Sequence, residues 1–209
     1  HWMVHSFPTR RSSDLSAALR RQGKQGTILL ADHELVAQNP DLSDHFMVQP
    51  DRDNADYIYE TQALVELKGR KLHKKKNLLT QFINTYSPYQ TELIVQPNFE
   101  ICKGLTERWW RNKESRDDPS EPERMAIQRC LHHFDRLNVG GLTIRCGEVL
   151  VACAIFSRHS PDTYCIHFEK FDQDYKGSAQ AINWETARYL QSLGVSYIDR
   201  EQDMGNDGL

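Results

Sequence analysis

Three small residues, Gly177, Ser178 and Ala179, open a predicted helix that follows a predicted strand and a charged loop. In residues 164–170 the apolar side chains alternate with the other side chains, which is the period of a strand. Small residues let backbone N–H groups approach a ligand closely, and such groups at a helix N-terminus bind phosphates. The spacing therefore indicates an enzyme that handles a nucleotide or a cofactor. The alternative is an ordinary strand–helix junction with a glycine at the bend.

A second candidate site is a run of six cationic side chains within nine residues. They are Lys68, Arg70, Lys71, Lys74, Lys75 and Lys76. Such charges repel one another unless an anion compensates them. On a helix, Lys71, Lys74 and Lys75 would share one face. The segment, which also contains His73 and Asn77, is therefore a candidate phosphate-binding surface, and the alternative is a solvated helix face.

A charged tail from Asp199 to Asp203 follows the last predicted strand. Ligands of open α/β sheets gather at the carboxyl ends of strands, so we expect this tail beside the loop at residues 174–178. Arg200 suits a phosphate or carboxylate, whereas Glu201 and Asp203 suit an ammonium group. The alternative is a polar turn.

The composition of the 209 residues, 39% apolar and 26% charged, is typical of a globular protein with one domain, or one domain and part of another. No run of 18 apolar residues occurs, so we expect no membrane-spanning helix. Five cysteines are scattered singly without a CxxC motif, which predicts reduced thiols and a cytoplasmic location. His132 and His133 lack a second metal-binding pair, so we expect no metal site.

Local signals divide the chain into short elements. Strands are predicted at residues 27–30, 46–48, 56–59, 142–145, 149–156, 164–170 and 195–198. Helices are predicted at residues 32–39, 63–67, 70–86, 98–110, 120–137 and 178–193. We expect a turn at Gly140 and Gly141 and a β-hairpin around residues 146–148. From residue 120 onward the order is helix, hairpin, strand, helix, strand.

Four sequence blocks together resemble the family of the phosphatidylglycerol lysyltransferase C-terminal domain. They are DRDNADYIY at 51–59, LKGRKLHKKKN at 67–77, HFEKFDQDYKGSAQAIN at 167–183 and YIDREQDMGNDGL at 197–209. The resemblance covers residues 27–209, and the order of elements after residue 120 resembles the GNAT acyltransferase fold. It implies an α/β (α+β) fold of GNAT type with a mixed central sheet, in tandem domains similar to those of Fem-type peptidoglycan aminoacyltransferases.

The resemblance also implies how the chain divides. Residues 16–59 would be the remnant of a first GNAT-like domain, and residues 60–209 a second one that lacks its closing helix and strands. Residues 1–15 resemble a translated sequencing-adapter read and are expected to be a non-native tail, with a natural polar tail as the alternative. We therefore expect a fragment truncated at both ends, inactive and with an exposed sheet edge.

The family reaction, as the resemblance implies it, moves an aminoacyl group from a charged tRNA to a hydroxyl or amine acceptor. Such a transfer needs a proton acceptor and a positive charge near the developing oxyanion. Glu169 or His167, expected on one strand face, would be the base, and Lys170 would stabilise the oxyanion. Asp203 is the fourth residue of this predicted catalytic group, and it would hold an ammonium group. The alternative is a half-exposed strand face with a local Glu–Lys pair.

The remaining candidates would contact the substrates or their phosphates. They are Arg70, Lys71, His73, Lys74, Lys75, Asn77, Asp174, Lys176, Gly177, Ser178, Arg200 and Glu201. The donor would be aminoacyl-tRNA or acyl-CoA, and the acceptor a lipid headgroup, with peripheral membrane contact, or another small molecule. The GNAT signature Gln/Arg-x-x-Gly-x-Gly/Ala occurs as Asp174-x-x-Gly177-x-Ala179, and the Asp174 carboxylate disfavours the pyrophosphate of coenzyme A. Two rivals remain, an acyl-CoA-dependent N-acetyltransferase and a non-catalytic module that binds anionic lipid or RNA.

Overall fold

The computed structural model describes residues 21–23, 33–42, 47–49, 55–95, 99–111 and 121–202. The chain divides into two compact units, and the first boundary falls between Tyr57 and Ile58, while residues from Glu201 onward group with the first unit. In the first unit, the predicted helix at 32–39 is present as α2, His33–Gln38. That this unit is the remnant of a GNAT-like domain stays a prediction.

Two short strands predicted for the first unit have different outcomes. The strand predicted at 27–30 lies outside the described residues. The strand predicted at 46–48 is wrong for its described part, since Met47 and Val48 are exposed and have no strand conformation. An apolar pair of this length forms a strand only where a neighbouring strand pairs with it, and no described strand pairs with these residues.

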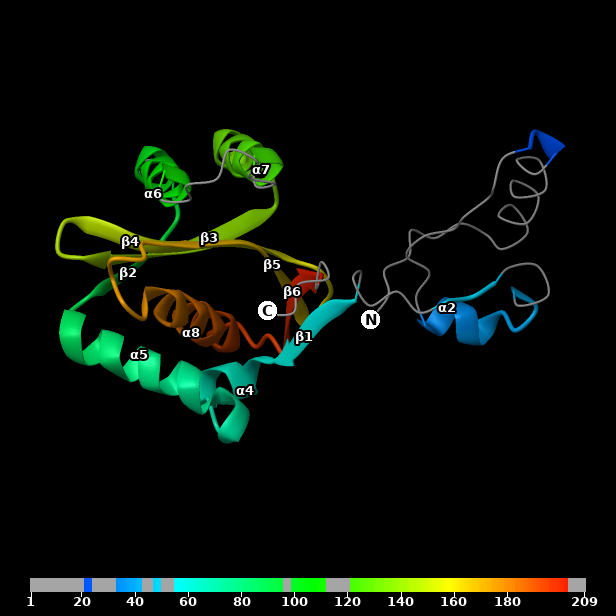
Figure 1. The fold of residues 1–209 in the computed structure, drawn as a ribbon, viewed down its shortest axis with the longest axis horizontal. Coiled ribbons are helices and arrows are strands. Elements are labelled where there is room, and N and C mark those ends of the chain that lie inside the picture. Colours follow the sequence, from blue (N-terminus) through cyan, green and yellow to red (C-terminus); the bar gives the residue numbers. More distant parts are fainter. Residues whose placement is uncertain are drawn as a thin grey trace. The chain divides into compact units, whose positions relative to one another are not determined.

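The second unit, Ile58–Arg200, is built on a mixed sheet of α/β type (Figure 1), as predicted. Its strands are β1 Asp56–Glu60, β2 Gln90–Leu93, β3 Val139–Cys146, β4 Val149–Arg158, β5 Thr163–Phe171 and β6 Tyr197–Gln202. Their order is β1-β6-β5-β4-β3-β2. The pairs β2–β3, β3–β4 and β4–β5 are antiparallel, whereas β5–β6 is parallel.

Helices cover both faces of this sheet (Figure 1). One layer consists of α4 Thr61–Glu66, the 3₁₀ turn η1 Arg70–Leu72, α5 His73–Tyr86 and α8 Ser178–Ser192. The other consists of α6 Phe99–Arg111, α7 Glu121–His132 and the 3₁₀ turn η3 Phe134–Arg136. The helix predicted at 120–137 is therefore interrupted after His132. No helix among the described residues has the length and apolarity that crossing a membrane requires.

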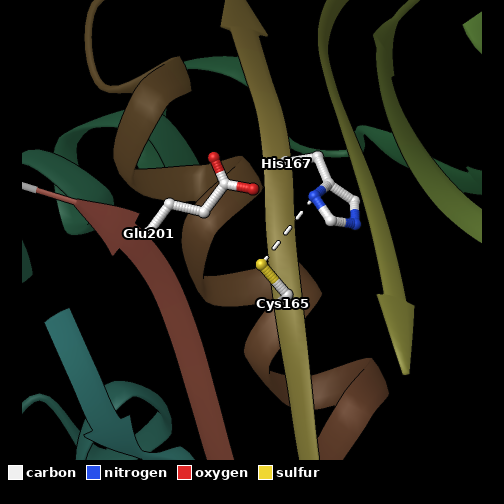
Figure 2. A group of neighbouring side chains, drawn as sticks. All are labelled: Cys165, His167 and Glu201. Atoms are coloured by element: carbon white, nitrogen blue, oxygen red, sulfur yellow. Dashed lines mark hydrogen bonds between the residues drawn. The ribbon is translucent and has the colours of Figure 1, made fainter. Parts of the chain in front are cut away.

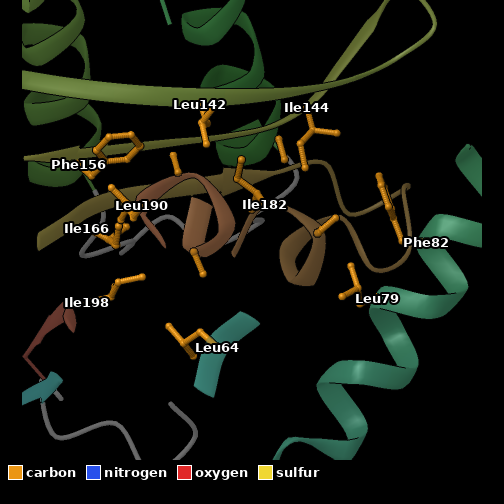
Figure 3. Packing of buried hydrophobic residues seen from close by; sticks show 14 of the residues in the cluster. Leu64, Leu79, Phe82, Leu142, Ile144, Phe156, Ile166, Ile182, Leu190 and Ile198 are labelled. Carbon is orange, nitrogen blue, oxygen red and sulfur yellow. The ribbon is translucent and has the colours of Figure 1, made fainter. Parts of the chain in front are cut away.

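The sheet separates two hydrophobic cores. The larger one, here called the α8 core, contains Leu64 of α4, Phe82 of α5 and Ile182 of α8 against Ile144 of β3 (Figure 3). The smaller one, the α6–α7 core, contains Leu105 and Leu131 with Cys153 and Ile155 of β4. The residues of β4 from Leu150 to Phe156 are all buried, because β4 has a packed helical layer on each face. Residues 150–156 therefore form a continuous apolar run rather than an alternating one.

The turn predicted at Gly140 and Gly141 is wrong, because both residues lie inside β3. A Cβ atom at Gly141 would lie 2.5 Å from Cδ1 of Ile94 and 2.7 Å from the carbonyl oxygen of Ala154. The glycine is needed for close approach of neighbouring segments rather than for a turn. The edge strand β2 was not predicted, because Gln90–Leu93 is polar at three of four positions and fully exposed.

The parallel ladder between β5 and β6 is short. It joins Thr163 to Tyr197, Tyr164 to Ile198 and Cys165 to Asp199, and no later pair is formed in the described residues. The strand predicted at 195–198 accordingly begins later, at Tyr197, and extends to Gln202. Beyond Cys165, the remaining residues of β5 are paired with β4 alone.

Replacement of Gly141 by Ala should destabilise the protein, because the Ala154 carbonyl belongs to the backbone and cannot rotate away from the new methyl group. We expect the free energy of unfolding to fall by about 1–3 kcal/mol, measured by urea denaturation. Gly104→Ala is a matched control, since its methyl group would meet only Nη1 of Arg108 at 3.9 Å and alanine favours a helix by up to about 1 kcal/mol. Equal stability of the two variants would contradict the packing argument.

Candidate functional site

A β-bulge in β5 separates the two predicted bases. Phe168 and Ile166 lie opposite consecutive residues of β4, so His167 is an additional residue in the ladder. Ile166 accordingly packs in the α8 core and Phe168 among the residues of the α6–α7 core. The expectation that His167 and Glu169 share one face is therefore wrong, because the bulge interrupts the alternation of side chains.

Glu169 is held at the point where β5 and β6 have separated. Its carboxylate accepts a charge-assisted hydrogen bond from the guanidinium of Arg200 on β6. Its other oxygen accepts a hydrogen bond from Nδ2 of Asn183 on α8, at 3.4 Å. Glu169 and Arg200 are both partly buried, so the pair is screened less than a surface ion pair. The predicted base and the predicted anion-binding residue therefore lie in direct contact.

Lys75 of α5 adds a second cation to this cluster. Its pKa is lowered, first because neighbouring protein displaces water from the ammonium group and next because Arg200 repels it, whereas Glu169 acts in the opposite direction. One carboxylate thus faces two cations. The cluster formed by Lys75, Glu169, Asn183 and Arg200, here called the β5–β6 cluster, carries a net positive charge that suits an anionic ligand group.

Lys170, predicted to stabilise an oxyanion, lies on the other side of the sheet. It is only 5% exposed, and its ammonium donates a hydrogen bond of 2.8 Å to Oε1 of Glu123 on α7. A buried cation with a carboxylate partner is commonly part of the packing of two layers. The arrangement favours a structural contact between β5 and α7, and the predicted catalytic role of Lys170 stays a prediction.

His167 lies between a hydroxyl and a thiol. Its Nε2 is 2.8 Å from Oγ of Ser157 on β4. Its Nδ1 is 3.8 Å from Sγ of Cys165, two residues earlier on the same strand, and the two side chains point toward each other (Figure 2). Neither Ser157 nor Cys165 was a predicted site residue, because a contact across a bulge has no regular spacing in the sequence.

The loop before α8 uses most of its polar groups internally. Ser178 is buried, its N–H donates to the Tyr175 carbonyl, and its hydroxyl donates to the Asp172 carbonyl. The exposed Asp174 donates its backbone N–H to the Asp172 carboxylate, and Lys176 is exposed nearby. The predicted phosphate-binding role of Asp174, Lys176 and Ser178 stays a prediction.

Gly177, the N-terminal cap of α8, has a positive φ of 88°. A Cβ atom here would lie 2.9 Å from Cβ of Phe82 and closer still to the carbonyl oxygen of Leu78. The glycine thus permits close packing of α8 on α5. Packing against α5 is therefore sufficient to explain why this residue is a glycine, and no ligand is needed for that. The first N–H groups of α8 are still oriented as in any helix N-terminus.

The basic segment lines an open pocket of about 640 Å³ at the start of α5. Its lining residues are Leu67, Lys68, Gly69, Arg70, His73, Lys74 and Lys76. Lys71 and Asn77 are exposed in the same segment, and Asn77 contacts His73 at 3.4 Å. The first turn of α5 contains no acidic residue, so cations there face the positive end of the helix dipole. Lys74 lines this pocket, whereas Lys75 belongs to the β5–β6 cluster. The two lysines, predicted to share a face, therefore belong to two neighbouring groups of cations.

The charged tail is only partly described. Asp199 is buried, and Arg200 contacts Glu169 as stated above. Glu201 is half-buried and has a φ of 60°, a conformation that non-glycine residues rarely adopt outside turns and functional sites. Asp203 lies outside the described residues, so its predicted role is untested.

Comparison with known proteins identifies relatives of this chain. Residues 13–209 match the model of the family described as phosphatidylglycerol lysyltransferase, C-terminal. An uncharacterised protein of Mycoplasmoides gallisepticum is 24% identical over 160 residues, which cover 73% of this chain and 49% of that protein. The chain therefore spans about half the length of this curated relative.

Two solved structures have a similar fold. A conserved protein of unknown function from Bacteroides thetaiotaomicron superposes with a TM-score of 0.82 at 28% identity, covering 93% of this chain and 66% of that chain. The structure of L-PGS from Bacillus licheniformis gives a TM-score of 0.51 at 11% identity, covering 74% of this chain and 48% of that chain. The predicted α/β fold with a mixed central sheet is confirmed, and it is the fold that this chain shares with the lysyltransferase structure.

Replacement of Lys75 by Gln should stabilise the fold at neutral pH, because it removes an ammonium group whose pKa burial and Arg200 both lower. We expect the melting temperature to rise by up to about 3 °C, a small change because Lys75 is exposed and solvent screens its charge. Since the folded-state pKa lies below the ordinary value of 10.5, the folded state binds fewer protons, and the gain should vanish as the pH rises toward that value. Lys74→Gln, which removes the adjacent charge, is the control. An equal shift in both variants would contradict the proposed repulsion.

Proposed function

Because the chain belongs to the family of the phosphatidylglycerol lysyltransferase C-terminal domain, we propose that the protein is an aminoacyl transferase. It moves an aminoacyl group from aminoacyl-tRNA to the hydroxyl or amine of a lipid headgroup or another small acceptor. The family is one of transferases, and the choice of donor and acceptor is the part that is proposed.

The observation that best supports this proposal is the β5–β6 cluster. A carboxylate, a guanidinium, an ammonium and an amide from four different elements meet beside the open end of the β5–β6 ladder. Strand ends that separate in this way leave room for a ligand at a sheet, where α/β proteins commonly bind their substrates. Residues brought together from α5, β5, α8 and β6 are more informative than charges on one exposed helix face.

In this proposal each side chain has a role that matches its chemistry. Glu169 accepts the proton of the attacking hydroxyl or amine, as general bases of transfer reactions do. Arg200 orients this carboxylate and, with Lys75, stabilises negative charge on the donor or on the transition state. Asn183 fixes the second carboxylate oxygen. The neighbouring basic segment binds the phosphodiester backbone of the donor or an anionic membrane surface.

A second candidate function is acyl-CoA-dependent N-acetyl transfer. The observation in its favour is the start of α8, where no side chain caps the helix and the positive end of the helix dipole suits an anion. Asp174, exposed in the preceding loop, places a carboxylate close to the chain position where the pyrophosphate of coenzyme A would bind, which disfavours this donor. We therefore propose aminoacyl-tRNA ahead of acyl-CoA.

Both donors should be tested side by side with the full chain. We expect transfer of radiolabelled lysine from lysyl-tRNA to vesicles that contain phosphatidylglycerol, and no transfer from acetyl-CoA to an amine. Glu169→Gln should lower the transfer rate about 10²- to 10⁴-fold, because a neutral amide cannot accept the proton.

Glu92→Gln on the exposed strand β2 removes the same charge away from the cluster and should leave the rate unchanged. Melting temperatures of both variants establish that they are folded. An unchanged rate in Glu169→Gln would exclude Glu169 as the base, and transfer from acetyl-CoA alone would favour the second candidate.

Charge reversal in the basic segment tests the proposed polyanion contact. The double variant Arg70→Glu/Lys74→Glu changes two pocket-lining residues. It should weaken binding of tRNA or of phosphatidylglycerol vesicles and reduce the slope of log K against log salt by about two. Filter binding and vesicle sedimentation measured from low to moderate salt distinguish the two ligands.

Arg129→Glu/Arg136→Glu is the matched control, because it makes the same change of charge on α7 and η3, in the opposite helical layer. Equal losses in the two double variants would indicate only a general effect of net charge. If the Arg70→Glu/Lys74→Glu variant loses binding while Glu169→Gln has no effect in vivo, the result would instead favour a non-catalytic binding module.

A further inference from the structure

Three side chains of β5 and β6 bring together atoms that are common ligands of transition metals. The thiol sulfur of Cys165, a ring nitrogen of His167 and a carboxylate oxygen of Glu201 all lie within 4.8 Å of one another. Figure 2 shows the three side chains directed toward one another. Thiolate, imidazole and carboxylate are the ligand types of zinc sites in proteins, so the group has the chemistry of a metal site.

The distance between the thiol and the imidazole is suitable for a shared metal ion. Sγ of Cys165 lies 3.8 Å from Nδ1 of His167. Zn–S and Zn–N bonds of about 2.3 and 2.0 Å at a tetrahedral angle place two such atoms about 3.5 Å apart. The observed separation is therefore close to that of two ligands of one zinc ion. The flexible side chain of Glu201 can adjust the remaining distances.

The second ring nitrogen of His167 has the kind of partner that a metal-bound histidine needs. Its Nε2 lies 2.8 Å from Oγ of Ser157 on β4. A histidine that binds a metal through one nitrogen almost always donates the N–H of the other to an oxygen atom, which fixes the tautomer and the ring orientation. When Nε2 donates to Ser157, Nδ1 carries the lone pair that a metal requires.

The backbone places the three ligands where the two strands separate. Cys165 and Asp199 form the last pair of the β5–β6 ladder, and His167 and Glu201 each follow two residues later. His167 is the inserted residue of the bulge, and Glu201 has a φ of 60°. Two departures from regular strand conformation therefore meet at one point, and both kinds of departure are concentrated at functional sites.

This group lies on the opposite face of the sheet from the β5–β6 cluster. Cys165 is opposite Ser157 of β4, and Ser157 alternates with Ile155 of the α6–α7 core. Glu169 is opposite Ala154, which belongs to the α8 core. A metal bound beside Cys165 is therefore separate from the proposed transfer chemistry, and its presence does not depend on that function.

We propose that Cys165, His167 and Glu201 bind one zinc ion, which connects β5 to β6 beyond the last residue pair of their ladder. The buried Cys165 binds as a thiolate after releasing its proton, and the half-buried His167 and Glu201 bind through Nδ1 and a carboxylate oxygen. The thiolate and the imidazole favour zinc over magnesium or calcium, which take oxygen ligands. Three protein ligands leave the fourth position to water.

This assignment differs from two expectations drawn from the sequence. Glu201 was predicted to contact an ammonium group, and no metal site was expected because His132 and His133 lack a second pair. Ligands that come from two paired strands have no characteristic spacing in the sequence. Their convergence depends on the pairing of β5 with β6, which no local pattern contains.

Metal binding is tested with the full chain after a chelator has removed any bound metal. Equilibrium dialysis against Zn²⁺ should give one bound ion per chain. Co²⁺ in its place should give the visible absorption of a four-coordinate ion and the near-ultraviolet charge-transfer band of a cobalt–thiolate bond. Cys165→Ser should abolish this band. Cys165→Ser, His167→Gln and Glu201→Gln should each weaken zinc binding about 100-fold or more, since even the loss of an outer partner costs about 10- to 100-fold.

Matched controls make the same substitutions outside the group. Cys146→Ser changes the half-buried thiol of β3, and His159→Gln and Glu148→Gln change exposed residues. All three should bind zinc as the unchanged protein does. Ser157→Ala should weaken binding about 10- to 100-fold and keep the cobalt–thiolate band, because it removes only the partner of the histidine.

A second readout is thermal stability. An ion that binds only the folded state stabilises it, so zinc at about a hundredfold above its Kd should raise the melting temperature by about 5–10 °C. The same zinc concentration should leave the melting temperature of Cys165→Ser unchanged. Melting of each variant without metal establishes that it is folded.

The outcomes decide the proposal. A folded chain that binds no zinc, or that binds Co²⁺ without the thiolate band, would overturn it. Equal losses in the control variants would mean adventitious binding to scattered side chains and would also overturn it. One zinc ion per chain, lost in the three ligand variants and retained in the three controls, would establish the site.

Discussion

The parallel ladder between β5 and β6 lasts for three residue pairs, and the rest of the candidate site depends on where it ends. Once the strands separate, β6 no longer supplies hydrogen bonds to the backbone of β5. A charged contact between Arg200 and Glu169 spans the opening instead. The helices α5 and α8 then bring Lys75 and Asn183 to the same place. Separation of the two strands thus leaves room for charged groups that pair with one another beside the sheet.

The bulge at His167 also separates polar side chains of β5, because it places them on different faces of the sheet. A regular strand would have placed His167, Glu169 and Phe171 in one row. The additional residue sends Glu169 toward α8 and leaves His167 beside Ser157. Two groups of polar residues therefore occupy one strand without competing for the same partner. Lys170 is used differently again, since its contact with Glu123 joins β5 to α7.

Much of the fold could be predicted from local pattern, and the exceptions have physical reasons. The hairpin of β3 and β4 and the helix α8 have strong signals of period and turn, and both are present. The strand β2 has none, because its exposed polar residues form a strand only by pairing with β3. Gly140 and Gly141 suggest a turn, whereas their actual constraint is crowding by Phe156 and by Ile94 and Ala154, respectively, contacts that no local pattern contains.

The candidate site was predicted less completely, since its partners come from distant segments. The sequence indicates Glu169, Arg200 and Lys75 as charged residues near a ligand, but it does not indicate that the three meet. Asn183 and Ser157 carry no distinctive spacing at all. Lys74 and Lys75 illustrate the limit, because adjacent helix positions differ by about 100° in direction, and only packing of α5 on α8 decides which one faces Glu169.

The burial of β4 on both faces has a consequence for how the protein moves. Each helical layer covers one side of this strand, so opening of the α6–α7 layer leaves β4 still hydrogen-bonded to β3 and β5 and still covered by the α8 core. Local opening of that layer can therefore occur as a separate cooperative unit, while the amide protons of β4 exchange with water only when the whole unit unfolds. The strand β4, which pairs with the strand that carries Glu169, therefore stays ordered while the α6–α7 layer opens.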